Sequence, residues 1–194
     1  VLTDDLALSG IVACLYDQRS WPALSAALSA AMHSDGSALL ALADDYNDRS
    51  ADGYTSNLPE AFIAVTCTDS AQPDRSSAEL EADAQAIRLA APTIGRHVSG
   101  APWTCAHWPV RQGLASIPVA TPDAPMILVV GTTGDPATPY EWSRSLAEQL
   151  TSGTLLTYEG EGHTAYGKGV ACIDSAVDDY LLHGKAVRAG QTCR

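Results

Sequence analysis

The stretch MILVVGTTGDPATPYEWSRSLAEQL, residues 126–150, opens with an unbroken apolar run. A run without alternation is typical of a strand that is buried on both faces of a parallel sheet. A loop rich in Gly, Thr and Pro follows the run, and a helix is expected over residues 139–150. Thr138, Pro139 and Glu141 predict a capping box with proline at the first helical position. The stretch therefore predicts one strand–loop–helix unit.

The same order of elements repeats directly downstream. Residues 154–160, TLLTYEG, predict a second strand, GEGHTAYGKG forms the next loop, and residues 170–183 predict a final helix that ends at Gly184. Strand, loop and helix occurring twice in succession predict a parallel crossover unit. Because two buried parallel strands need further pairing and cover, we expect most of their sheet to lie outside this chain.

The first 91 residues are predicted to be mainly helical. A helix is expected over residues 3–16, and Ser76 with Glu79 has the spacing of a capping box at the start of another. The run AFIAVT, residues 61–66, is the one segment here that we interpret as extended. Further helices are predicted within RSWPALSAALSAAM (19–32), where Ser20 is the expected cap, and SDGSALLALADDY (34–46).

Residues 92–125 have a different composition. Two tryptophans, Trp103 and Trp108, lie among prolines that are expected to break every helix in this part of the chain. A solvated linker has little use for tryptophan, so we interpret the segment as an ordered, packed connection. The prolines are Pro92, Pro102, Pro109, Pro118, Pro122 and Pro125.

Composition excludes several classes of function. The chain has 194 residues, 46% of them apolar, and a net charge of −12, which makes a binder of nucleic-acid phosphates or of an anionic membrane surface implausible. No apolar run approaches the roughly 20 residues of a transmembrane helix. Since the chain begins abruptly at Val1, we expect it to be a processed or truncated product.

The cysteines give no metal signal, because none of them forms a C-x-x-C pair. Two disulfides with one odd cysteine are what an exported protein would contain, and buried free thiols in a cytosolic protein are the alternative. Spacing alone leaves both interpretations open. The five residues are Cys14, Cys67, Cys105, Cys172 and Cys193.

The two predicted strands are each followed by a residue suited to acid–base chemistry. Asp135 follows the first strand, and His163 follows the second within a glycine-framed loop. Functional groups of open α/β sheets collect at the carboxyl ends of the strands, so the two side chains are expected to meet there. A carboxylate in that position orients a catalytic imidazole, and the order acid then histidine matches that of α/β-hydrolases.

The amino-acid sequences of these motifs indicate more than the order of the two residues does. Residues 125–150 followed by GTLLTYEGEGHTAYG resemble the C-terminal part of the actinobacterial α/β-hydrolases that include Streptomyces tripeptidyl aminopeptidases and mycobacterial cell-envelope serine hydrolases. The resemblance continues through ACIDSAVDDYLLHGKAVRAGQTC. The segments LYDQRSWPALSAALSAA, ALLALADDY, AFIAVTCTD and CAHWPV resemble the cap region of the same family, so the resemblance covers nearly the whole chain.

The resemblance implies an α/β fold: a fragment of the α/β-hydrolase fold with a mainly helical cap followed by the last two parallel strand–helix units. It implies a cap over residues 1–110 and a C-terminal part of the core over 111–194. Asp135 becomes the triad acid and His163 the general base, with no metal and no cofactor. It also implies the disulfides Cys67–Cys105 and Cys172–Cys193, which leaves Cys14 unpaired or paired with an absent part.

The chain departs from the family pattern at the nucleophile. The family uses a serine in a G-x-S-x-G elbow, and that motif does not occur here. The nearest imitations, at Ser37 and Ser99, are not expected between a buried strand and a helix. We therefore expect the nucleophile to lie upstream of this chain, in an N-terminal part that is its partner. Asp69, in CTD, matches a recurrent family position and is a candidate for contact with substrate.

The resemblance implies a secreted or cell-envelope serine hydrolase. A peptidase that releases short peptides from a free amino terminus is favoured, because the cap narrows access to the site. A carboxylesterase or lipase of the same fold is the first alternative, since one triad serves both reactions. An inactive fragment that acts only as a binding or structural module is the second.

Overall fold

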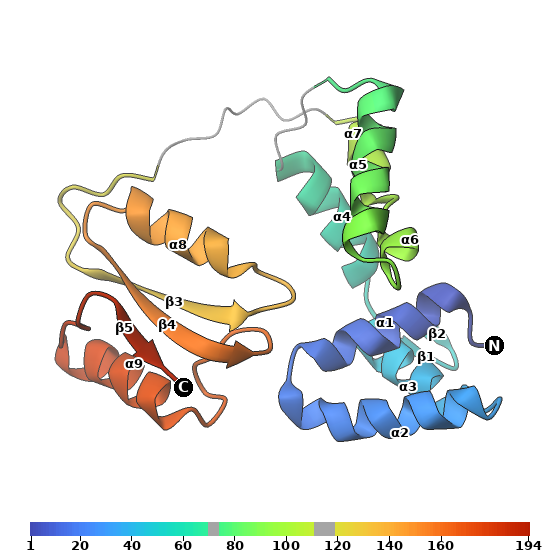
Figure 1. Ribbon diagram of the computed structural model, residues 1–194, viewed down its shortest axis with the longest axis horizontal. Helices are drawn as coiled ribbons and strands as arrows, with labels where there is room; N and C mark the ends of the chain where they lie inside the picture. The colour runs from blue at the N-terminus through green and yellow to red at the C-terminus, as the bar shows by residue number, and fades with distance from the viewer. Residues whose placement is uncertain (70–73, 111–118) are drawn as a thin grey trace. The chain divides into compact units, whose positions relative to one another are not determined.

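The computed structural model describes residues 1–69, 74–110 and 119–194 (Figure 1). Contacts divide the chain into two compact units. We call the first, Val1–Ala13 with Ala27–Ile117, the helical unit, and the second, Cys14–Ala26 with Pro118–Arg194, the sheet unit. The domain assignment made from the sequence, with its division after residue 110, stays a prediction.

The sheet unit is built on three parallel strands in the order β3-β4-β5. The two long strands are β3 (Ile127–Gly134) and β4 (Gly153–Glu161), as the apolar runs predict. Their register pairs Ile127 with Gly153 and shifts near the end, between Thr132 and Gly134. The parallel order brings the carboxyl ends of both strands to the same edge of the sheet.

Helices cover the two faces of this sheet, with α8 (Tyr140–Gln149) and α9 (Ala171–His183) on opposite sides (Figure 1). Side chains alternate along the strands, so Val130 and Leu156 face α9 while Thr157 faces α8. The Tyr140 hydroxyl lies 2.7 Å from that of Thr157. Gly131 allows α8 to pack closely, because a Cβ atom there would lie 2.8 Å from Cβ of Ser143.

The α9 face holds the core of the sheet unit. Ile173 and Val177 are one helical turn apart on α9, and both are buried against Leu156 of β4. Ala165, Val187 and Cys193 complete this cluster. As the sequence predicts, α9 ends at Gly184, which adopts the left-handed conformation with φ of 62°.

The third strand, β5 (Gln191–Cys193), pairs with β4 and was not predicted. It has only three residues, QTC, and carries no apolar run or alternation that would indicate a strand. Tertiary contacts fix it instead: Leu156 of β4 is paired with Gln191, and the disulfide Cys172–Cys193 joins β5 to the first turn of α9.

The predicted start of α8 is wrong in detail. Pro139 precedes the helix with extended backbone, φ −47° and ψ 135°, and no side chain caps the helix. The expected capping box with Glu141 fails because the Thr138 hydroxyl donates to Asp135 at 3.0 Å. The helix therefore begins at Tyr140, one residue later than expected.

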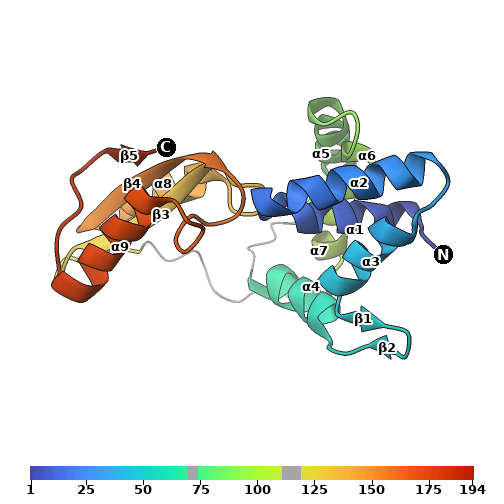
Figure 2. The ribbon, with the colours of Figure 1, turned by 90° about the horizontal axis from the view of Figure 1, so that it is seen from below.

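The helical unit consists of short helices and one two-stranded hairpin. Helices α1 and α3 pack closely, and Gly10 of α1 makes this possible (Figure 2). A Cβ atom at this position would lie 2.6 Å from the Leu39 carbonyl oxygen. The end of α1 and the start of α2 belong to the sheet unit. The elements are α1 (Asp4–Leu15), α2 (Trp21–Met32), α3 (Ser37–Tyr46), β1 (Arg49–Ser50), β2 (Gly53–Tyr54), α4 (Leu58–Asp69), α5 (Ser77–Ala90), α6 (Gly95–Val98) and α7 (Ala101–Ala106).

Two local predictions in this unit have opposite outcomes. The capping box of α5 is confirmed, since Ser76 and Glu79 exchange both hydrogen bonds. The extended interpretation of residues 61–66 is wrong, because they lie inside α4. Start signals outweigh the apolar run there: the Ser56 hydroxyl accepts the Leu58 N–H at 3.2 Å, and Pro59 occupies the first turn.

The proline-rich connection is also more helical than predicted. It contains α6 and α7, and Pro102 lies in the first turn of α7, where no intrahelical N–H is required. Trp108 is half-buried and donates from Nε1 to the Thr68 hydroxyl at 3.2 Å. The disulfide Cys67–Cys105 joins α4 to α7. Pro118 lies outside the described residues.

None of the helices in the described ranges combines the length and the apolar character that a bilayer span requires.

Candidate active site

Asp135 and His163 meet at the carboxyl ends of the paired strands. Asp135 follows the last residue of β3 directly, and His163 comes two residues after β4 ends. The imidazole Nδ1 lies 3.0 Å from each carboxylate oxygen of Asp135. The Asp135 side chain is 4% exposed and that of His163 is 28% exposed, so the acid is buried and the base reaches the surface.

Four further hydrogen bonds hold the Asp135 carboxylate. The backbone N–H groups of Ala137 and Thr138 donate to Oδ1 at 2.9 and 2.8 Å. The Thr138 hydroxyl and the Thr164 N–H donate to Oδ2 at 3.0 and 3.1 Å. The loops that follow both strands thus close around one carboxylate, and its two oxygens have little rotational freedom.

These donors set the charge of the acid. Burial by itself raises the pKa of Asp135, because it disfavours the ionised form. The hydrogen bonds outweigh that effect and lower the pKa to about 2, with the backbone N–H groups of Thr138 and Ala137 contributing most. Asp135 is therefore an anion throughout the physiological pH range.

The anion fixes the tautomer of the histidine. A carboxylate only accepts hydrogen bonds, so the proton of the neutral imidazole is on Nδ1. The opposite nitrogen, Nε2, is left with its lone pair and can accept a proton from a reacting group. This is the arrangement of a general base with its orienting acid.

Backbone geometry brings His163 to this position. Gly162 has φ of 106°, which favours glycine, and its N–H donates to the Gly134 carbonyl at 3.3 Å. Thr164, on the other side of the histidine, is also left-handed with φ of 62°. The loop therefore turns sharply on both sides of the histidine and is tied to the end of β3.

The serines that imitate the family elbow lie elsewhere. Ser37 is the first residue of α3 and donates to Asp35 Oδ1 at 2.6 Å, and Ser99 follows α6 and accepts from Arg88 at 3.4 Å. Both belong to the helical unit. In the described ranges no serine stands between a buried strand and a helix. The assignment of the nucleophile to an upstream part stays a prediction.

Other sequence candidates stay predictions as well. Asp69 is the exposed last residue of α4 in the helical unit. Cys14 is a free, buried thiol, whereas the other four cysteines form the two disulfides that the resemblance implies. The described residues contain no group of three or more Cys, His, Asp or Glu side chains that could hold a metal ion.

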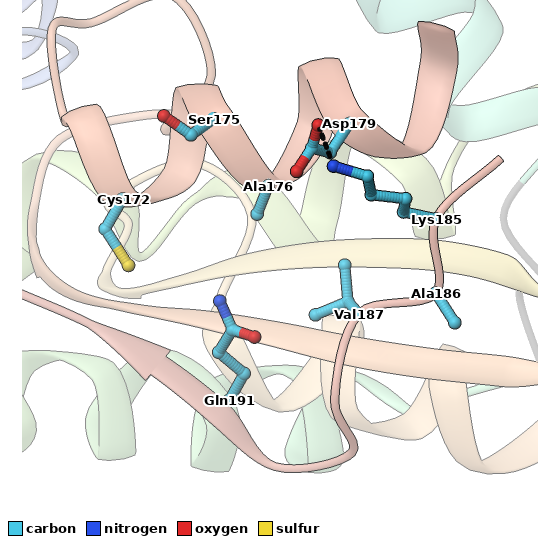
Figure 3. A pocket seen from close by; sticks show the side chains of 8 residues that line it. All are labelled: Cys172, Ser175, Ala176, Asp179, Lys185, Ala186, Val187 and Gln191. Carbon is cyan, nitrogen blue, oxygen red and sulfur yellow. Dashed lines mark hydrogen bonds and ion pairs between the residues drawn. The ribbon is translucent and has the colours of Figure 1, made fainter. Parts of the chain in front are cut away.

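A hollow of about 260 Å³ lies beside α9 and β5 in the sheet unit (Figure 3). The ion pair between Lys185 and Asp179, 2.9 Å long, stands along its wall. Neither Asp135 nor His163 contributes to its lining. The hollow is therefore separate from the candidate active site.

Three contributors to the site were not predicted. Thr138 and Thr164 hold the carboxylate, and the Tyr16 carbonyl accepts the His163 N–H at 2.9 Å. For Thr138 a local signal existed, since an aspartate commonly accepts hydrogen bonds from the backbone of residues two and three positions later. For Tyr16 no local signal exists, because it is far from His163 in sequence.

Comparison with known protein families identifies the family of the chain. The model of the TAP-like protein family of α/β-hydrolases matches residues 91–193, more than half of the chain. The chain belongs to this family. The TAP-like match includes both Asp135 and His163 and every element of the sheet that carries them.

Individual relatives extend the similarity into the helical half. A Mycobacterium tuberculosis protein named carboxylesterase B is 42% identical over 182 residues, which cover 92% of this chain and 35% of that protein. The serine protease Hip1 of the same species is 36% identical over 96% of this chain and 36% of its own length. The tripeptidyl aminopeptidase of Streptomyces lividans is 28% identical over 92% of this chain and 33% of its own. The TAP-like chain thus spans about a third of the length of these relatives.

Proposed function

We propose that this chain is the C-terminal portion of an exported serine hydrolase that works with a Ser-His-Asp triad. The hydrogen bond of His163 Nδ1 with the buried, ionised Asp135 carries the proposal. The relatives named as a serine protease, a carboxylesterase and an aminopeptidase support it, as all three names describe hydrolases of acyl bonds. The serine that completes the triad belongs to a part of the protein upstream of this chain.

The chemistry of the two residues follows from their geometry. His163 Nε2 takes the proton of the attacking serine hydroxyl, and the positive imidazolium that results is stabilised by the Asp135 anion. The same proton then passes from Nε2 to the leaving group. In the second half of the reaction His163 takes a proton from water and returns it to the serine. No cofactor is needed for either step.

Peptides with a free amino terminus are the proposed substrates, with short peptides released from that end. The resemblance to tripeptidyl aminopeptidases and to a serine protease supports this choice. Ester substrates are the second candidate, favoured by the 42% identity to the protein named carboxylesterase B. The two disulfides support a secreted or cell-envelope location, because such bonds persist in oxidising compartments.

A serine-directed fluorophosphonate probe tests the triad. The full-length protein should be labelled, whereas this chain alone should not be. Replacing His163 by Ala in the full-length protein should abolish turnover and suppress labelling. Labelling of the chain alone would disprove the upstream position of the nucleophile. Normal activity of H163A would disprove the assignment of the base.

The substrate class requires a separate comparison. Tripeptidyl p-nitroanilides with free and with acetylated amino termini should be compared with p-nitrophenyl esters of short acids, by kcat/KM. Preference for the free peptide supports the aminopeptidase, and preference for the esters supports the carboxylesterase. A full-length protein that turns over neither and is not labelled would be a binding or structural module.

A further inference from the structure

A turn at residues 16–18 contacts the histidine loop at three points within the sheet unit. The Tyr16 carbonyl accepts the N–H of His163 at 2.9 Å. Gln18 Nε2 donates to the Glu161 carbonyl, two residues before the histidine, at 3.2 Å. Asp17 Oδ2 lies 3.3 Å from Nζ of Lys168, beyond the histidine. Three consecutive residues thus hold the loop before, at and after its central residue.

The turn itself is well fixed. Asp17 precedes a short helix, η1 (Gln18–Ser20), and accepts the backbone N–H of Arg19 at 2.9 Å. The Arg19 guanidinium also donates to both carboxylate oxygens of Asp17. Hydrogen bonds from Arg19 hold the pKa of Asp17 well below its usual range, so Asp17 is ionised and can pair with Lys168. The buried Cys14 lies just before the turn.

Glycine at position 162 permits the close approach of turn and loop. A Cβ atom there would lie 3.1 Å from the Tyr16 carbonyl oxygen, tighter than an ordinary contact. Its φ of 106° is a backbone conformation that residues other than glycine rarely adopt. Gly162 therefore lets the histidine loop lie directly against the turn, where a larger residue would contact it too closely.

The side chain of Tyr16 contacts the imidazole as well. The two rings are arranged edge to face, with centroids 5.1 Å apart and planes at 78°. Aromatic rings favour this edge-to-face arrangement, so the contact restricts the orientation of the imidazole. The imidazole is accordingly contacted by Asp135 through Nδ1 and by the Tyr16 ring, while the Tyr16 carbonyl holds the backbone of His163.

We infer that Tyr16, Asp17 and Gln18 form a brace that positions His163 for catalysis. The brace acts through the histidine and does not touch reacting atoms, so its members are positioning residues. This role rests on the proposed function, in which His163 is the base. Since a displacement of about 1 Å can lower a rate about 100-fold, a brace that fixes the loop controls kcat.

Two variants of the full-length protein test the brace, each with a matched control. Gln18→Ala removes one hydrogen bond to the loop, and Gln149→Ala removes an equivalent bond to Ser145 on the surface of α8. Gly162→Ala pushes the loop away from Tyr16. Gly190→Ala is its control, since that glycine also has positive φ, of 72°, but its Cβ would meet nothing within 4 Å.

The first measurement is hydrogen exchange at the His163 amide, which needs no activity. Exchange should accelerate about 10-fold in Gln18→Ala and more in Gly162→Ala, and it should not change in the controls. The second is steady-state kinetics: kcat should fall about 10-fold in Gln18→Ala and about 100-fold in Gly162→Ala, while KM stays within about twofold. If Gly162→Ala does not fold, Gln18→Ala alone decides.

Each result has one meaning. Unchanged exchange in Gln18→Ala overturns the brace as a structural element. Faster exchange with kcat equal to that of the controls overturns its role in catalysis. An equal rise in exchange in Gln149→Ala would show a general loss of stability and would also overturn it. Full activity in H163A would instead overturn the proposed function, and the exchange data would still report on the brace.

Discussion

His163 Nδ1 is equidistant from the two carboxylate oxygens of Asp135, at 3.0 Å, although 28 positions separate the residues in the chain. This relationship follows from the parallel pairing of β3 with β4, which ends both strands at the same edge. A buried anion that accepts five hydrogen bonds orients the imidazole through Nδ1.

Replacing Asp135 by Asn should lower kcat/KM by about 10⁴-fold. The amide cannot carry the negative charge, and its NH₂ group would favour the wrong tautomer of His163. Steady-state kinetics of the full-length protein check this. Asp179→Asn is the control, since it removes only a surface ion pair with Lys185 and should leave kcat/KM unchanged. A loss under 10-fold in D135N would contradict the role of the acid.

Asp135 should also make stability depend on pH. Its pKa is about 2 in the folded protein, against 3.8 for an ordinary aspartate, so the unfolded chain binds the proton more readily. The contribution is complete above pH 5 and disappears as the pH falls from about 4 to about 2, with a total of about 2 kcal/mol. Urea unfolding of the wild type and D135N, compared at pH 6 and pH 2.5, measures it. The difference between the two proteins should shrink at pH 2.5, and a constant difference would rule out the shift.

The Thr138 hydroxyl should contribute to both stability and activity. Thr138→Val keeps the shape of the side chain and removes the donor that lies 3.0 Å from Asp135 Oδ2. We expect a loss of about 1 kcal/mol in the free energy of unfolding, together with a lower kcat. Thr192→Val, at an exposed position of β5, is the matched control for chemical unfolding and kinetics. Equal effects in the two variants would exclude a specific role for Thr138.

The disulfide Cys172–Cys193 should stabilise the edge of the sheet. It closes a segment of 21 residues and joins α9 to β5, which has only three residues of its own. Replacing both cysteines by Ser should lower the free energy of unfolding by about 2–4 kcal/mol. Hydrogen exchange should show faster opening of β5 in this variant and no change in α5. An unaltered β5 would mean that its pairing with β4 is sufficient.

Local patterns in the sequence predicted those parts of the fold that local forces determine. The apolar runs of β3 and β4, the capping box at Ser76 and the left-handed Gly184 each need only neighbouring residues. β5 was missed because three polar residues become a strand only when a partner strand and a disulfide hold them. The capping box at Thr138 failed because its hydroxyl donates instead to Asp135, three positions earlier, whose carboxylate is held in place by its contact with His163.

The candidate site likewise contains residues that local sequence could predict and residues that it could not. The meeting of Asp135 and His163 could be predicted because each follows a recognisable strand. Their supporting groups could not be identified in full, since Thr164 and Tyr16 act through backbone atoms that any residue type provides. The role of Gln18 could not be predicted for a further reason: its hydrogen-bond partner, Glu161, is 143 positions away in the sequence. A single sequence contains no signal for a contact over that separation.

That separation has a consequence for the order of events during synthesis. The turn at residues 16–18 leaves the ribosome well before its partners on the histidine loop, since Gln18 and Glu161 are 143 positions apart. Contacts over long separations also form slowly, because a large loop must close before they add stability. The base of the proposed triad therefore acquires its final position only after β3 has paired with β4 and the turn has closed onto the histidine loop.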